Sequence, residues 1–266
     1  KNPELGFSKP RILIGSSPPS CYHIFSDRRC QQLEDLCRER KTNDVVGIIA
    51  GLDYSVDHKS SKANGGHASR HDQLTVCRKH LSLAADTGLP VILTLGGTTT
   101  KASLLEDAER DLLELAIDCL PPSHFILLSA YSGSPDSILA FRRHFVNLYV
   151  GISGNISYRS MAAQAKEIAF DCPMDKLVLV SQAPHVLPNH QSMVEEAKDD
   201  MEQGHGFLLS SLTLTDDDNN NKMYRIESFQ SSGLNTSCMI PIIAMYVARE
   251  KRCSVEDVLS RTLKNT

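Results

Sequence analysis

The stretch Val45-Val46-Gly47-Ile48-Ile49-Ala50-Gly51-Leu52-Asp53-Tyr54 is an apolar run that ends in an aspartate and a tyrosine. Such a near-continuous apolar run is typical of a strand covered on both faces, as the strands of parallel sheets are. The sequence predicts five more strands of this kind, at 11–15, 90–94, 124–128, 148–153 and 176–180.

Helical patterns lie between these runs. Ser103-Leu-Leu-Glu106 predicts a capping box that opens a helix, Ser134-Pro135 places a proline at a first helical position, and Ser254 starts the last helix. The apolar run 238–248 is shorter than the ~20 residues that cross a bilayer and predicts a buried helix. Strand–helix alternation implies right-handed βαβ units, hence an α/β fold with a parallel sheet or barrel.

Composition is that of an ordinary globular protein. The chain has 266 residues, of which 41% are hydrophobic and 23% charged, which excludes a disordered, fibrous or disulfide-stapled class. The net charge of −4 provides no bulk positive field, so any nucleic-acid contact needs a local basic patch, and a membrane partner has no support. We expect one domain over residues 1–266, with a mobile insertion at 213–237.

Cysteine usage suggests a compartment. The eight cysteines are dispersed without a CxxC pair, which is typical of reduced thiols in a cytoplasmic or nuclear protein. Two sequons, at Asn155 and Asn235, match glycosylation chemistry by chance often enough to set aside.

Several strand-end motifs come in a particular order, and together they resemble the TatD family of metal-dependent nucleases. That resemblance implies a TIM-like (β/α) barrel of the TatD and amidohydrolase type, which would use divalent metal ions to hydrolyse phosphodiesters. It covers Ile12 to about Ser192 and resumes in the C-terminal helices. The motifs are Gly51-Leu-Asp-Tyr54, Tyr131-Ser-Gly-Ser134, Val150-Gly-Ile-Ser-Gly154, Cys172 to Pro184 and Thr262 to Thr266.

The departures from the family pattern fall on its metal ligands. Family histidines are replaced by Ser17, Thr94 and Ser129, the bridging glutamate by Ile49, and the final aspartate by Gln182. Gly96 stands at an arginine position and Val180 at a glutamate position. Neutral hydroxyls and amides are poor ligands for divalent ions, so we expect no metal and no metal cofactor.

The family's opening Asp-x-His-x-His strand and its second strand have no counterpart before Gly15. We therefore expect a barrel whose first two strands are missing from this chain. An upstream segment or a protein partner would complete the barrel, because proteins normally pair or cover exposed sheet edges.

Other groups of ligand-type residues have ordinary explanations. His67, His71 and Asp72 could share a helical face, but a solvated loop-to-helix junction explains them better. Cys21, His23, Cys30 and Cys37 lack zinc-finger spacing, and we expect them in the core. The basic clusters 38–41, 142–144 and 249–252 are expected at helix C-termini, where cations offset the helix dipole; a nucleic-acid groove built from them stays an alternative.

Our leading hypothesis is a pseudoenzyme, a TatD-like pseudo-nuclease retained as a binding or scaffold element. Its barrel mouth would be lined by Ser17, Ile49, Asp53, Thr94, Ser129 and Gln182, with Asp53 an acceptor for loop amides and no residue in a catalytic role. One alternative is an active DNase or phosphoesterase that uses other ligands, such as Asp53, His67 or His71. Another is a nucleic-acid-binding module that does not cleave.

Overall fold

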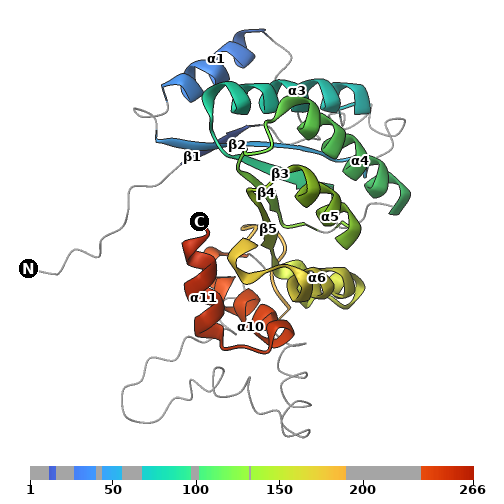
Figure 1. Cartoon of the computed structure of the whole chain (residues 1–266), viewed down its shortest axis with the longest axis vertical. Helices are drawn as coiled ribbons and strands as arrows, with labels where there is room; N and C mark the ends of the chain where they lie inside the picture. Colours follow the sequence, from blue (N-terminus) through green and yellow to red (C-terminus); the bar gives the residue numbers. More distant parts are fainter. Residues whose placement is uncertain are drawn as a thin grey trace, which may run out of the picture. The chain divides into compact units, whose positions relative to one another are not determined.

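The computed structural model describes residues 12–15, 27–39, 44–55, 68–96, 102–131, 133–189 and 235–266 (Figure 1). Strands and helices alternate through most of the chain. The strands are β1 (Ile12–Gly15), β2 (Val45–Leu52), β3 (Val91–Leu95), β4 (Ile126–Ser129), β5 (Leu148–Ile152) and β6 (Leu177–Leu179). The α-helices are α1 (Asp27–Arg38), α3 (Arg70–Thr87), α4 (Ala102–Cys119), α5 (Pro135–His144), α6 (Arg159–Asp171), α10 (Ile240–Lys251) and α11 (Val255–Lys264). The 3-10 helices are η3 (Gly154–Ser157), η4 (Met174–Lys176) and η5 (Ser237–Met239).

The six strands lie where the apolar runs predicted them, with boundaries shifted by one or two residues. Their order in the sheet follows their order in the chain, from β1 to β6. β1 pairs with β2, β2 with β3 and β5 with β6, all in parallel. The parallel α/β arrangement is therefore confirmed.

The chain divides into two compact units, and the first comprises residues 1–128 and 136–148. Figure 1 shows α3 and α4 lying outside the strands of this unit, and both helices pack against β2 and against each other. Ile48, Leu93 and Leu112 are at most 1% exposed and belong to its apolar core.

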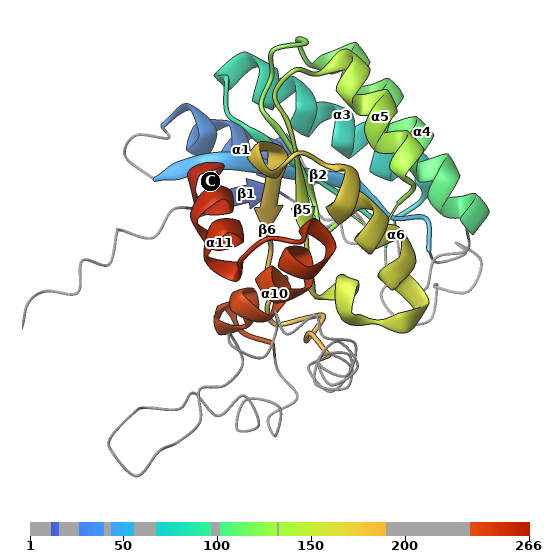
Figure 2. The same ribbon diagram turned by 60° about the horizontal axis from the view of Figure 1, so that its bottom comes forward.

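The second unit comprises residues 129–135 and 149–266. α10 packs against α6, α11 and β6 in this unit (Figure 2). Its residues 242–248 are all buried, as we predicted for the apolar run 238–248, because a helix that is apolar all round must lie inside a unit. Among the described helices, none is both long and apolar enough to cross a lipid bilayer.

Helix starts agree with the sequence at two places and differ at a third. α5 begins at Pro135, and Ser254 caps α11 by accepting a hydrogen bond from the Asp257 amide. The predicted capping box at Ser103 is wrong, because α4 already begins at Ala102. A capping box forms instead at the start of α3, where the Ser69 and Asp72 side chains each accept from the other's backbone N–H.

Candidate functional site

The end of β2 presents Asp53, whose main chain is clamped by Gln73 of α3. The Gln73 side-chain oxygen accepts from the Asp53 amide at 2.7 Å, and its nitrogen donates to the Asp53 carbonyl at 2.8 Å. The Asp53 carboxylate accepts from the backbone N–H of Ser55 at 2.9 Å. We expected Asp53 to accept from loop amides, and this contact with Ser55 is of that kind.

Thr94 lies beside this strand end, opposite Gly51 in the β2–β3 register. A Cβ at Gly51 would lie 2.1 Å from the Thr94 carbonyl oxygen and 2.3 Å from its hydroxyl, so only glycine allows the strands this approach. The Thr94 hydroxyl is 3.4 Å from the Ala50 carbonyl, to which it donates. Ile49 is half-buried on β2, whereas its neighbour Ile48 is fully buried.

Tyr54, the residue after Asp53, is bound to both neighbouring helices. Its hydroxyl donates to Asp111 of α4 at 2.7 Å, and the same carboxylate accepts two hydrogen bonds from Arg70 of α3. Burial and the hydrogen bond to Asp111 raise the pKa of Tyr54, which keeps the phenol protonated. The loop that carries Asp53 is therefore held from both sides.

In the second unit, Ser129 and Gln182 lie at strand ends on either side of β5. The Tyr131 amide donates to Gly151 and the Val180 amide donates to Ile152, which places the segments after β4 and β6 along the same strand. Gln182 adopts a left-handed backbone conformation with φ of 54°. Its side-chain oxygen is buried and accepts no hydrogen bond within the described structure.

Asn235 organises the loop after β6, and sequence reasoning did not identify this role. Its side-chain nitrogen donates to the carbonyls of Ser181, His185 and Val186, and the residue is 3% exposed. The one sequence pattern that marks Asn235 is the sequon, which indicates glycosylation and not a buried hydrogen-bond donor. Burial of Asn155 (5% exposed) and Asn235 excludes both from glycosylation in the folded protein. Residues 213–234 of the expected mobile insertion lie outside the described residues.

The side chains at the positions where the resemblance implies metal ligands do not fit a divalent metal ion. Ile49, Thr94, Ser129 and Gln182 offer two hydroxyls and one amide, with no carboxylate or imidazole. No group of three or more His, Cys, Asp or Glu side chains within the described ranges is arranged to hold a metal. Such neutral oxygens bind divalent cations poorly. Ser17, the fifth position, lies outside the described residues.

The other sequence candidates are dispersed. His71 is exposed near the start of α3, and Asp72 serves the helix cap there. Cys37 is fully buried, as we expected of a core thiol. The last turns of α1, α5 and α10 contain basic residues of the three clusters, as predicted: Arg38, Arg142 to His144, and Arg249 with Lys251. Residues 40 and 41 of the first cluster lie outside the described residues. His67, Cys21 and His23 lie outside the described residues, as does the side chain of Cys30.

Comparisons with known proteins agree with the fold. The sequence model of the family "TatD related DNase" matches residues 7–266. An uncharacterized amidohydrolase from Saccharomyces cerevisiae superposes with a TM-score of 0.63 at 15% identity, covering 95% of this chain and 78% of that one. The TatD homologue YJJV from Escherichia coli K12 gives a TM-score of 0.62 at 18% identity, covering 96% and 74%. The predicted TIM-like fold of the TatD and amidohydrolase type is thereby confirmed.

One curated relative carries a functional name. The human "3'-5' RNA nuclease TATDN2" is 26% identical over 117 residues, which are 44% of this chain. The matched region is only 14% of that relative, so the chain spans a small part of its length.

Proposed function

This chain belongs to the TatD-related DNase family, and we propose that it is a non-catalytic member, retained as a binding or scaffold domain. The observation that carries the proposal is the set of side chains at the strand ends. Hydrolysis of a phosphodiester in the manner implied for this family needs divalent cations, which neutralise the phosphate and generate hydroxide from water. Ile49, Thr94 and Gln182 supply none of the anionic or imidazole ligands that would hold such cations.

The contacts around the strand ends support a structural role for this region. Gly51 permits the close approach of β2 and β3, and Gln73 and Asp111 hold the segment at Asp53 and Tyr54. Fold and function can separate in this way, because the site occupies a few side chains whereas the fold depends on the whole core.

Metal content and nuclease activity test the proposal together. We expect purified protein to hold no stoichiometric zinc, magnesium or manganese by elemental analysis, and to leave labelled single-stranded DNA and RNA intact. One tightly held metal per chain, or cleavage that a chelator abolishes and Asp53→Ala removes, would show an active enzyme that uses other ligands.

A repaired variant extends this test. Ser17→His, Ile49→Glu, Thr94→His, Ser129→His and Gln182→Asp together restore the family's ligand types. We expect measurable divalent-metal affinity with lowered stability, because coordination depends first on ligand type and placement. Failure of the variant to gain any metal affinity would mean that the strand ends no longer follow the family path.

A nucleic-acid-binding role is the second candidate, favoured by the RNA nuclease relative. RNA binding without cleavage would weaken steeply with salt, because phosphate contacts release counterions.

The cytoplasmic or nuclear location stays a prediction. Completion of the barrel by an upstream segment or a partner also stays a prediction. Ile12 and Leu13 of β1 are 47% and 44% exposed, and we expect an added strand to cover this apolar surface.

A further inference from the structure

The last turn of α5 carries three adjacent basic residues, Arg142, Arg143 and His144. All three are exposed, and within the described residues none of them has a hydrogen-bond or ion-pair partner. A helix C-terminus carries about half a negative charge, which less than one arginine offsets. With His144 neutral, about 1.5 positive charges are therefore left over at this end of α5.

The basic clusters of the other two helices are already engaged. Arg38 in the last turn of α1 lies 3.8 Å from Glu34. Lys251 in the last turn of α10 donates hydrogen bonds to the carbonyls of Phe170 and Cys172. The cluster of α5 is thus the one whose arginines have no partner within the described structure.

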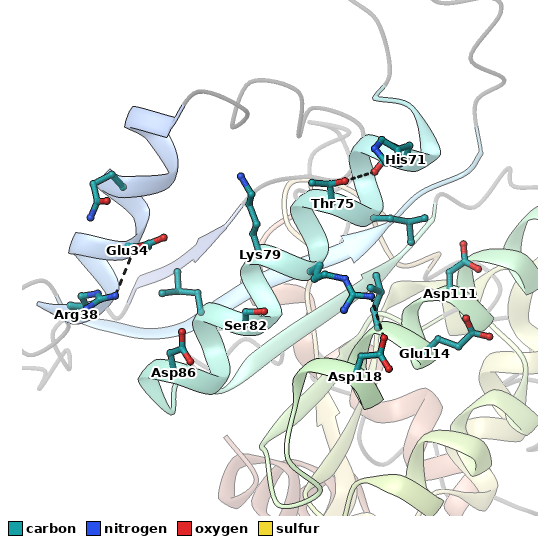
Figure 3. A pocket seen from close by; sticks show the side chains of 15 residues that line it. Glu34, Arg38, His71, Thr75, Lys79, Ser82, Asp86, Asp111, Glu114 and Asp118 are labelled. Carbon is teal, nitrogen blue, oxygen red and sulfur yellow. Dashed lines mark hydrogen bonds and ion pairs between the residues drawn. The ribbon is translucent and has the colours of Figure 1, made fainter.

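A groove over α3 also carries charges, but they compensate each other. Its volume is about 1060 Å³, and α1, α3 and α4 contribute its lining (Figure 3). Arg78 of α3 lies 3.2 Å from Asp118 of α4, and Arg70 lies 2.7 Å from Asp111. Because charges of both signs are paired across this groove, it attracts a charged ligand less than the end of α5 does.

The end of α5 lies beside the loop that leads into β4. The Val146 amide donates to the Pro122 carbonyl at 3.1 Å, and the Ile126 amide donates to the Asn147 carbonyl at 3.0 Å. Phe125, next to Ile126, is 52% exposed, and Val146 is 67% exposed. The α5 patch consists of Phe125, Arg142, Arg143, His144 and Val146.

The segments that form the α5 patch contain no acidic residue. Residues 119–126 and 137–148 include no aspartate or glutamate, and both segments belong to the first unit. Asp118 pairs with Arg78, and Asp136 lies in the first turn of α5, at the other end of that helix. The patch is therefore locally positive, although the net charge of the chain is −4.

We propose that the α5 patch binds single-stranded nucleic acid. Guanidinium groups match phosphate oxygens in shape and charge, and an exposed aromatic ring offers a face on which a base stacks. These are the two features by which proteins hold single strands without reading their sequence. The arginines provide the first feature and Phe125 provides the second.

This inference rests on the nucleic-acid-binding candidate and names its surface. Phe125 precedes β4 and Val146 precedes β5, so the patch lies where these strands begin. Ser129, at the end of β4, is at the opposite end of the same strand. Binding at the α5 patch therefore does not depend on the side chains at the strand ends.

Fluorescence anisotropy with a labelled single-stranded RNA of about 12 nucleotides tests the proposal. Wild-type protein should bind this RNA, with an affinity that falls as salt is raised. Arg142→Gln and Arg143→Gln should each weaken binding several-fold and reduce the salt slope by about 0.7, the value for one phosphate contact of a single strand. Phe125→Ala should weaken binding about fivefold or more and leave the salt slope unchanged, because stacking involves no phosphate.

Arg110→Gln is the matched control. Arg110 is an exposed arginine of α4 in the same unit, outside the α5 patch, and it pairs with Asp107. The substitution lowers the net charge by the same amount, so it should leave both the affinity and the salt slope at their wild-type values. Circular dichroism melting of each variant verifies that it folds.

Three outcomes would overturn the proposal. Equal weakening by Arg110→Gln and the two α5 variants would mean attraction to the overall charge alone. RNA binding that neither α5 variant changes would leave the nucleic-acid-binding candidate standing and remove the α5 patch from it. If the protein binds no RNA, the candidate and the inference fail together, and binding of a poly-glutamate peptide that Arg142→Gln weakens would then assign the patch to an acidic protein segment.

Discussion

The Tyr54 hydroxyl donates a hydrogen bond of 2.7 Å to Asp111, which joins the end of β2 to α4 across 57 residues of sequence. Arg70 binds the same carboxylate through two N–H groups, each at 2.9 Å, and its guanidinium lies 5.0 Å from the centre of the Tyr54 ring. One carboxylate thus connects the strand end to both covering helices. This arrangement stabilises the fold whether or not the strand ends carry chemistry.

We expect Tyr54→Phe to lower the free energy of unfolding by about 1–2 kcal/mol, the cost of losing a hydrogen bond to a charged group. Urea denaturation measures the change. Tyr149→Phe is the control, because the Tyr149 ring packs under Lys176 and its hydroxyl makes no hydrogen bond within the described structure. An equal loss in both variants would mean that the Tyr54–Asp111 contact contributes nothing of its own.

The same tyrosine predicts a pH dependence. The pKa of Tyr54 is raised in the folded protein above its ordinary value of 10.0, so the folded state favours the protonated phenol. The stabilisation is full below pH 10 and is lost as pH rises through the folded pKa. The stability difference between wild type and Tyr54→Phe should therefore shrink above pH 10. A difference that stays constant to higher pH would contradict this.

His80 should make the stability of the protein fall at acidic pH. It is 2% exposed, its Nδ1 lies 2.8 Å from the Val76 carbonyl, and burial lowers its pKa from 6.5. Neutral His80 is favoured in the folded state, so stability is full above pH 6.5 and is lost as pH falls toward the folded pKa. His80→Leu should flatten the decline in denaturation midpoint below pH 6.5.

His124 is also buried with a lowered pKa, so part of the acid dependence should remain in His80→Leu. His144 is exposed, so His144→Gln is the control for replacing a histidine and should leave the denaturation midpoint at neutral pH unchanged. An unchanged slope in His80→Leu would show that His80 is not the titrating group.

Neighbouring isoleucines on β2 should respond differently to the same charge. Ile49 is half-buried, and we expect Ile49→Glu to cost about 1–3 kcal/mol while the protein still folds. Ile48 is fully buried, and Ile48→Glu should cost more than about 4 kcal/mol, because it places a carboxylate in the apolar core. Thermal melts compare the two, and equal costs would contradict the alternation in burial.

Asn235→Asp should loosen the loop after β6. The substitution keeps the shape of the side chain but replaces the donor to three carbonyls with a carboxylate, at a cost of about 3 kcal/mol or more. The loss should be smaller at low pH, where a protonated carboxyl can donate one hydrogen bond. Urea denaturation and hydrogen exchange at 181–189 measure both effects.

Asn147→Asp is the matched control, since the Asn147 amide also donates to a carbonyl, that of Ser123 at 2.8 Å, but at the surface. It should cost less than about 1 kcal/mol, because water can solvate the groups left without a partner. If both variants lower the free energy of unfolding by the same amount, the buried hydrogen bonds of Asn235 stabilise the protein no more than the surface hydrogen bond of Asn147 does.

The positions of the strands were predictable from the sequence. A strand covered on both faces needs an apolar run, so Val45–Leu52 could be located by composition alone. The apolar α10 was predictable for the same reason. The side-chain types at Ile49 and Gln182 are also a property of the sequence, because isoleucine has no donor atom and glutamine offers only a neutral amide in any fold.

Local capping signals were less decisive. Ser103 has the sequence of a capping box, yet α4 starts one residue earlier, whereas the box at Ser69 forms where we predicted only a loop-to-helix junction. Several short stretches satisfy the same capping pattern. Packing of each helix on the sheet selects where it begins.

By itself, the sequence determined the order of strands and helices and the types of side chain at the strand ends. Only the tertiary structure decided which distant residues hold those ends: Gln73 for Asp53, Asp111 for Tyr54, and Asn235 for the loop after β6. It also decided that charges from α1, α3 and α4 share one groove. Strand and helix formation follow from the periodicity of neighbouring residues, whereas these contacts depend on how separate elements pack, which no local pattern encodes.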